Sequence, residues 1–237
     1  MSLEPYKTSL IKLCIDNRIL TFGTFTLKSG RTSPYFFNAG LFNTSSLLRS
    51  LSSAYAQTIH SSFTNSDSVP QFDLLFGPAY KGIPLASTVL LSLGLLSPVY
   101  DGITYAFNRK EAKAHGEGGS IVGASLKGKR VLIVDDVITA GTAIREAVEI
   151  IRREGGEVVG IVVALDRGER VGSVEEREGG EVSGEKVSTV EMVGRETGVR
   201  VEAVLTLADV IGGLKEGGLV GEEEVRRMEE YRAKYGA

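Results

Sequence analysis

Three nearly continuous apolar runs constrain the fold of this chain more than any other feature. They occupy residues 72–76, 130–136 and 157–167, and the first two lead through glycine-containing turns into stretches with helical spacing. Such runs are typical of strands buried on both faces, and strands that alternate with helices form parallel sheets. The sequence therefore predicts an α/β fold with a central, mainly parallel sheet flanked by helices.

The rest of the chain fits a single domain over residues 1–237. Residues 1–45 predict a small opening unit, in which a helix precedes two short strands joined at Gly30, and a further helix follows over about 45–60. Between about 168 and 200 the composition shifts to glycine and glutamate, which favours a solvated, variable excursion without chemistry. A chain of this length can bury a core without disulfides.

Charge and cysteine usage narrow the class of protein. The formal net charge of -3 provides no overall basic field for nucleic acid, and the single cysteine, Cys14, cannot form an intrachain disulfide. The N-terminus lacks the features of a signal peptide. Serines, a glycine and prolines interrupt the most apolar stretch, residues 83–100, so we expect a buried helix followed by a strand there, not a membrane span. We therefore expect a cytoplasmic protein that binds neither nucleic acid nor membrane.

The strongest chemical signal is the string VLIVDDVITAGTA at residues 131–143. Asp135 and Asp136 stand where a strand would end, and open α/β sheets bind ligands at that edge. The small residues 139–143 precede a helix, whose N-terminal N–H groups can bind phosphate. Because carboxylates would repel a phosphate, we expect the aspartates to bind sugar hydroxyls or face a cation. Helix capping and solvent exposure are the alternative, and the string lacks the lysine of a P-loop.

This string resembles the phosphoribosyl-diphosphate signature of type I phosphoribosyltransferases, with an apolar strand, paired acids and then T-x-G-T. Residues 25–40, 77–86 and 107–119 resemble, in the same order, the motifs of the orotate phosphoribosyltransferase family. Together the four segments cover most of residues 20–167. The resemblance implies the type I phosphoribosyltransferase fold, a small N-terminal hood over about residues 1–45, and a homodimer with shared active sites.

The resemblance also implies which residues bind the two substrates. For phosphoribosyl diphosphate they are Lys28, Tyr80, Lys81, Arg109, Lys110, Lys113, His115, Asp135, Asp136, Val137, Ile138, Thr139, Ala140, Gly141, Thr142 and Ala143. For orotate they are Phe36, Phe37, Thr139 and Arg167. No residue is expected to bind a metal directly, because Mg2+ would be held through the substrate diphosphate.

Several of these positions also have a structural interpretation. Phe36 and Phe37 are adjacent on an expected strand, so their rings face opposite sides and either could belong to the core. Lys28 lies by a turn, where a solvated lysine is the alternative. Gly77 and Gly82 would permit unusual backbone angles in the turn between them.

Residues 109–119 combine cationic side chains with glycines. Composition alone favours a mobile, solvated loop, but such a loop can also close over a polyanion and exclude water. The resemblance implies the second interpretation, a lid that reaches into the neighbouring subunit's site. The expected catalytic residues are Arg109, Lys113, His115 and Asp136.

Arg167 follows the third apolar run and is the expected partner of the orotate carboxylate. A guanidinium pairs well with a planar carboxylate, and the family has an arginine at this position. A surface salt bridge is the alternative.

Together these features predict transfer of a phosphoribosyl group from 5-phospho-α-D-ribose 1-diphosphate to orotate in pyrimidine (UMP) biosynthesis. The products would be orotidine 5'-phosphate and diphosphate, with Mg2+ and the lid cations neutralising the leaving group. Two alternatives are a phosphoribosyltransferase for another base, such as a purine, and a non-catalytic regulator that keeps the fold and binds phosphoribosyl diphosphate or nucleic acid.

Overall fold

A computed structural model describes residues 3–27, 29–113, 119–138, 141–171 and 186–237 of the chain. None of the helices in these segments is long and apolar enough to cross a membrane.

The centre of the molecule is a six-stranded sheet with the order β5-β4-β3-β6-β7-β8. The antiparallel pairing of β5 with β4 is the exception in a sheet whose other neighbours are parallel. The strands are β3 (Leu74–Gly77), β4 (Thr104–Lys113), β5 (Gly119–Gly123), β6 (Arg130–Val137), β7 (Glu157–Asp166) and β8 (Val201–Thr206). The predicted α/β class and the mainly parallel sheet are confirmed.

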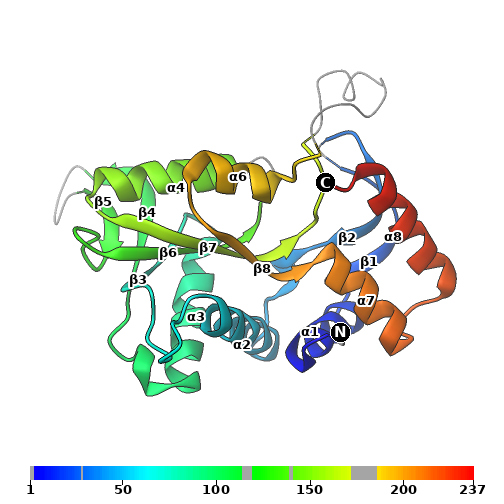
Figure 1. The fold of residues 1–237 in the computed structure, drawn as a ribbon, viewed down its shortest axis with the longest axis horizontal. Coiled ribbons are helices and arrows are strands. Elements are labelled where there is room, and N and C mark those ends of the chain that lie inside the picture. The colour runs from blue at the N-terminus through cyan, green and yellow to red at the C-terminus, as the bar shows by residue number, and fades with distance from the viewer. Residues whose placement is uncertain (1–2, 28, 114–118, 139–140, 172–185) are drawn as a thin grey trace.

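Helices cover both faces of this sheet (Figure 1). One face carries α2 (Ser45–Ser62) and α3 (Gly82–Leu96), and the other carries α4 (Thr142–Arg153) and α6 (Thr189–Thr197). Strand β6 supplies both layers, because successive side chains of a strand point to opposite faces. Leu132 and Val134 pack with the α2 and α3 side, whereas Val131 and Ile133 pack with the α4 side.

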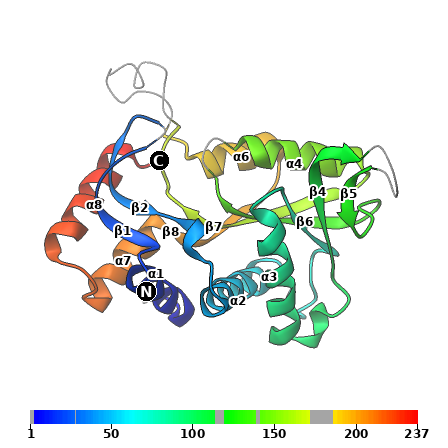
Figure 2. The same cartoon turned by 180° about the vertical axis from the view of Figure 1, so that it is seen from behind.

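The N-terminal hood consists of α1 (Pro5–Asp16) and the antiparallel pair β1 (Leu20–Thr26) and β2 (Thr32–Phe37). Two helices from the other end of the chain, α7 (Leu207–Gly217) and α8 (Glu222–Tyr235), lie beside it, as Figure 2 shows from behind. The rings of Tyr35 in β2 and Tyr231 in α8 meet edge to face, with centroids 6.3 Å apart. The hood is thus closed by the C-terminal helices, a contact that the sequence patterns did not predict.

Two expectations about local structure are wrong. Residues 172–185 of the expected solvated excursion lie outside the described residues, but its end forms α6, which buries Val193 against α4 because its apolar residues share one face. In the apolar stretch 83–100, α3 is followed by a 3-10 turn at Pro98–Tyr100, and strand β4 begins only at Thr104. A proline cannot donate to a ladder, which explains why the chain turns there first.

Helix α3 is also less buried than expected. Val89 and Leu93 are fully buried, but Leu91, Leu95 and Leu96 are exposed, with Leu95 89% accessible. The helix is apolar all round, so it leaves an apolar surface after packing on the sheet.

Candidate active site

The carboxyl ends of β3 and β6 bring two of the expected motifs together. The two strands are parallel neighbours, with Phe76 paired to Ile133, so the turn after β3 lies against the end of β6. The ammonium of Lys81 in this turn lies 2.5 Å from Oδ2 of Asp136 in β6. The structure therefore places the 77–82 turn and the paired aspartates in one site, at the edge where parallel sheets bind ligands.

The paired aspartates occupy different environments. Asp135 is 8% exposed, and the buried hydroxyl of Tyr55 donates a 2.7 Å hydrogen bond to its backbone carbonyl. Burial, reinforced by the charge of Asp136, raises the pKa of Asp135 to about 6. Asp136 instead pairs with Lys81 and accepts a hydrogen bond from the N–H of Val137. Burial therefore favours the neutral form of Asp135, whereas Asp136 forms an ion pair with Lys81.

The start of α4 is the segment expected to bind a phosphate. Gly141 is the N-cap residue at φ 75, in the left-handed region, and as a glycine it has no side chain that could cap this end of the helix. Thr142 and Ala143 are exposed in the first turn, while Ile138 before the loop is buried. Thr139 and Ala140 lie outside the described residues. The N–H groups of this first turn are therefore available to an anion.

The 77–82 turn needs its glycines for space, and its unusual backbone angle is the cis peptide bond between Ala79 and Tyr80. Neither Gly77 nor Gly82 has positive φ. A Cβ on Gly77 would lie 2.2 Å from the carbonyl oxygen of Gly82, and a Cβ on Gly82 would lie 2.9 Å from that of Val134. The turn folds back on itself and onto β6, which only hydrogen atoms at these positions allow.

The lid residues within the described part of the chain belong to a strand. Arg109 and Lys110 lie in β4, which runs through Lys113 and pairs with β5 from Gly119, so the expected loop over 109–119 begins and ends as sheet. The ammonium of Lys110 lies 5.0 Å from the ring centroid of Tyr80, which is 68% exposed. This contact joins the lid strand to the 77–82 turn. The side chain of Lys113, together with His115 and Lys28, lies outside the described residues.

Asn108 is a site residue that the sequence patterns missed. Its Oδ1 accepts a 3.0 Å hydrogen bond from the N–H of Ala79, whose peptide bond to Tyr80 is cis. Asn108 therefore anchors the 77–82 turn to the lid strand. Its position directly before Arg109 was the feature of the sequence that could have identified it as a site residue.

The two phenylalanines of the hood differ as expected for neighbours on a strand. Phe36 is 42% exposed and its ring lies 5.6 Å from that of Phe25. Phe37 is half-buried, packs against the core and approaches Phe42. One ring is therefore available to a planar ligand and the other holds the strand in place.

Arg167 lies just after β7 in a largely buried setting. Its Nε donates a 2.6 Å hydrogen bond to Glu169, its Nη2 donates to Ser33 at 3.2 Å, and its guanidinium lies 4.6 Å from the centroid of the Tyr35 ring. The side chain of Arg167 is 16% exposed and that of Glu169 is 15% exposed, so this ion pair is not the surface salt bridge considered as the alternative. Arg167 connects β7 to the strand that carries Phe36 and Phe37.

Protein side chains alone form no metal site in the described part of the chain. No three His, Cys, Asp or Glu side chains gather there in a way that could hold an ion. Mg2+ usually keeps waters and binds through one or two carboxylates and substrate phosphates, and the site offers Asp135 and Asp136. The donor set therefore fits a cation carried by a diphosphate.

Comparisons with known proteins match this geometry. A family model described as phosphoribosyl transferase domain matches residues 48–199. An orotate phosphoribosyltransferase of Coccidioides immitis is 52% identical over 248 residues, covering 100% of this chain and 99% of the relative. The chain belongs to the orotate phosphoribosyltransferase family. The orotate phosphoribosyltransferase of Thioalkalivibrio sulfidiphilus is 50% identical, covering 99% of this chain and 100% of that protein.

A solved structure confirms the expected fold. The crystal structure of an orotate phosphoribosyltransferase from Francisella tularensis superposes with a TM-score of 0.78 at 37% identity. The match covers 97% of this chain and 100% of that one, so the hood, sheet and C-terminal helices all belong to the orotate phosphoribosyltransferase fold.

Proposed function

We propose that this protein transfers the phosphoribosyl group of 5-phospho-α-D-ribose 1-diphosphate to N1 of orotate, giving orotidine 5'-phosphate and diphosphate. The contact of Lys81 with Asp136 at the end of β6 carries the proposal, in a chain that shares half its residues with orotate phosphoribosyltransferases. The reaction would serve UMP biosynthesis in the cytoplasm.

The ribose phosphate is assigned to the end of β6 and the start of α4. The first-turn N–H groups of α4, with the hydroxyls of Thr139 and Thr142, would hold the 5'-phosphate, next to the segment Val137–Ile138. As the C1–diphosphate bond breaks, its electron pair leaves with the diphosphate and positive charge develops on the sugar. Asp135 and Asp136 would hold the ribose hydroxyls and stabilise that charge.

The leaving diphosphate is assigned to the 77–82 turn and the lid. Lys81 is 71% exposed at its side chain, so it can reach a ligand while it stays near Asp136. Tyr80 belongs to the same turn, and Lys110 of β4 lies over its ring, next in sequence to Arg109. The other residues proposed to bind the diphosphate are Lys28, Lys113 and His115. Bound Mg2+ would add neutralising charge on the diphosphate oxygens, next to the carboxylates of Asp135 and Asp136.

Orotate is assigned to the space between the hood and the end of β7. Phe36 offers an exposed ring, Phe37 the adjacent backbone, and Arg167 a guanidinium for the orotate carboxylate, with Thr139 as a further contact. The nucleophile is N1 of the orotate anion, which forms the new bond to C1 of ribose.

A homodimer with shared sites accounts for the exposed apolar side of α3. Leu91, Leu95 and Leu96 of α3, with Val99 of the following 3-10 turn, are between 41% and 89% exposed and form a group of exposed apolar side chains. The same helix begins in the 77–82 turn, so an interface along α3 would join the second copy to an element that also carries part of this site. A two-fold interface of this kind is self-complementary.

The decisive experiment follows the absorbance of orotate. Loss of orotate absorbance that requires both phosphoribosyl diphosphate and Mg2+, and that stops when a chelator removes the metal, is the expected result. Adenine, guanine and hypoxanthine in a diphosphate-release assay test the purine alternative. Turnover of a purine without turnover of orotate, or binding of phosphoribosyl diphosphate with no turnover at all, would overturn the proposal.

The lid assignment has its own test. We expect Lys113→Ala to lower kcat by about 100-fold or more with both substrates saturating, because a cation that acts on the departing diphosphate matters most in the transition state. Lys127→Ala is the matched control, since Lys127 is exposed in the turn before β6, away from the proposed site. Near-normal kcat for Lys113→Ala would remove this residue from the catalytic set.

A further inference from the structure

Glu169 lies between two buried arginines that come from different parts of the chain. Its Oε1 accepts the 2.6 Å hydrogen bond from Nε of Arg167, and its Oε2 lies 3.5 Å from Nη1 of Arg31. The side chain of Arg31 is only 4% exposed. The carboxylate of Glu169 therefore forms ion pairs with two guanidinium groups, and both of these are largely shielded from water.

Arg31 belongs to the hood and is fixed independently of Glu169. It stands between β1 and β2, its Nη1 donates a 2.9 Å hydrogen bond to the backbone carbonyl of Arg170, and its guanidinium lies 4.9 Å from the centroid of the Tyr235 ring in α8. Arg31 thus approaches the carboxylate oxygen of Glu169 that does not accept from Arg167, and the Tyr235 ring of the C-terminal helix supports its guanidinium. This arrangement explains why Glu169 does not swing into solvent.

These contacts fix the guanidinium of Arg167 and leave Nη1 as the nitrogen that could donate to a ligand. Glu169 engages Nε, Ser33 engages Nη2, and the Tyr35 ring lies against the guanidinium plane. Nη1 donates to neither Glu169 nor Ser33, and the buried hydroxyl of Tyr231 also lies beside Arg167 and Glu169. An arginine has five N–H donors, so an incoming carboxylate can bind Arg167 without displacing Glu169.

We propose that Glu169 is the positioning residue for Arg167, with Arg31 as its anchor, and that this arrangement gives the site its selectivity for a base that carries a carboxylate. The inference rests on the proposed contact of Arg167 with orotate. Glu169 itself does not touch the substrate. It holds the guanidinium in the orientation that the orotate carboxylate needs, so that this orientation is present before the substrate arrives.

Two ligands isolate the carboxylate contact. Orotidine 5'-phosphate and uridine 5'-phosphate differ only in the carboxylate on the pyrimidine ring. The dissociation constant of uridine 5'-phosphate divided by that of orotidine 5'-phosphate therefore reports that contact alone. We expect Glu169→Gln to weaken orotidine 5'-phosphate binding by about tenfold or more in calorimetric titration, because hydrogen bonds to charged groups are worth this much. Binding of uridine 5'-phosphate should change little, so the ratio falls.

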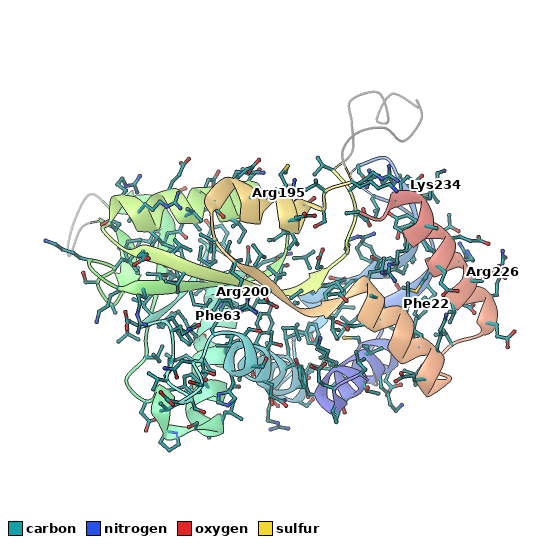
Figure 3. The ribbon with its side chains drawn as sticks, in the orientation of Figure 1. Phe22, Phe63, Arg195, Arg200, Arg226 and Lys234 are labelled. Carbon is teal, nitrogen blue, oxygen red and sulfur yellow. The ribbon has the colours of Figure 1, made fainter. Side chains whose placement is uncertain are left out.

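Glu202→Gln provides a matched control. Glu202 pairs with Nε of Arg200 at 2.7 Å, with the same two-residue spacing, but on β8. Figure 3 shows Arg200 next to Phe63, away from the end of α8 that carries Lys234. This variant should keep the wild-type ratio. If Glu169 had only a structural role, both ligands would weaken together in Glu169→Gln and the ratio would stay unchanged, which would overturn the proposal.

Two further variants keep the test decisive. Glu169→Asp retains the negative charge beside both arginines, but its side chain is shorter by one C–C bond, about 1.5 Å. It should also lower the ratio, and an unchanged ratio in every folded Glu169 variant counts against the positioning role.

Arg167→Gln separates the positioning role of Glu169 from the proposed contact of Arg167 with orotate. If Arg167→Gln lowers the ratio but the Glu169 variants do not, only the positioning role fails, whereas an unchanged ratio in Arg167→Gln removes the orotate contact itself.

Discussion

Asp135 and Asp136 show how two identical neighbours acquire different properties. The pleat of β6 turns one carboxylate toward the protein, where burial raises its pKa, and the other toward Lys81. The local sequence contains no signal for this division, because both acids belong to the same DD pair. The proposed binding of the ribose hydroxyls requires the ionised form of Asp135. Ionising a buried carboxyl group costs free energy.

Asp135→Asn should stabilise the fold above pH 6 while it lowers activity. The pKa of Asp135 is raised from 3.8 to about 6, so the wild-type protein loses stability as the pH rises through this range. Asparagine keeps the oxygen that accepts from the N–H of Asp136 but carries no charge. We expect a gain on the order of 2 kcal/mol at pH 7.5 in thermal unfolding, which shrinks toward pH 4.

Asp73→Asn is the control of opposite sign. The hydrogen bond from Arg130 lowers the pKa of Asp73 to about 2, so its contribution to stability is present above pH 4 and is lost on acidification. This variant should be less stable than wild type at pH 7.5. A loss of stability for Asp135→Asn at pH 7.5 would contradict the account of its burial.

At the scale of elements, the 77–82 turn depends on close backbone approach. Lys81 and Tyr80 can face the site because the chain reverses within a few residues after β3 and packs on β6. The lid strand β4 then meets the same turn through Asn108 and Lys110. The turn is therefore the element that connects the sheet edge to the lid.

Gly82→Ala should disturb this connection. The new Cβ would lie 2.6 Å from Cδ of Pro78 and 2.9 Å from the carbonyl oxygen of Val134, so the backbone must move. We expect a loss of about 1–3 kcal/mol in urea unfolding and a lower kcat/KM for phosphoribosyl diphosphate. Gly212→Ala in α7 has nothing within 4 Å of its Cβ and should gain up to about 1 kcal/mol. Equal stability of Gly82→Ala and wild type would refute the packing argument.

At the scale of the whole molecule, the site is assembled from parts far apart in the chain. The hood, the ends of β3, β6 and β7, and the C-terminal helices all contribute, and Arg227 of α8 donates a 2.7 Å hydrogen bond to the backbone of Gly23 in β1. The exposed side of α3 adds a second copy to this assembly in the proposed dimer. Activity should therefore depend on association.

Mixing two inactive variants tests the shared site. Subunits with Lys113→Ala, combined with subunits with Asp135→Asn, should recover about a quarter of wild-type specific activity, since half of the dimers are mixed and each has one intact site. Adding Leu95→Arg to both variants should abolish the recovery, because it places a charge on the apolar side of α3. No recovery despite measured subunit exchange would exclude cross-subunit catalysis.

The sequence alone determined the α/β class, the strand that carries Asp135 and Asp136, the helix that follows it and the family motifs, because apolar periodicity and short glycine-containing turns act over a few residues. Only the tertiary structure decided that Lys81 meets Asp136, that Glu169 lies between Arg31 and Arg167, and that α8 closes the hood. Such contacts join residues tens to hundreds of positions apart, and burial of the kind that raises the pKa of Asp135 depends on everything packed around it. The signature at residues 131–143 therefore indicates the ligand, while the packing of distant segments determines how the site recognises it.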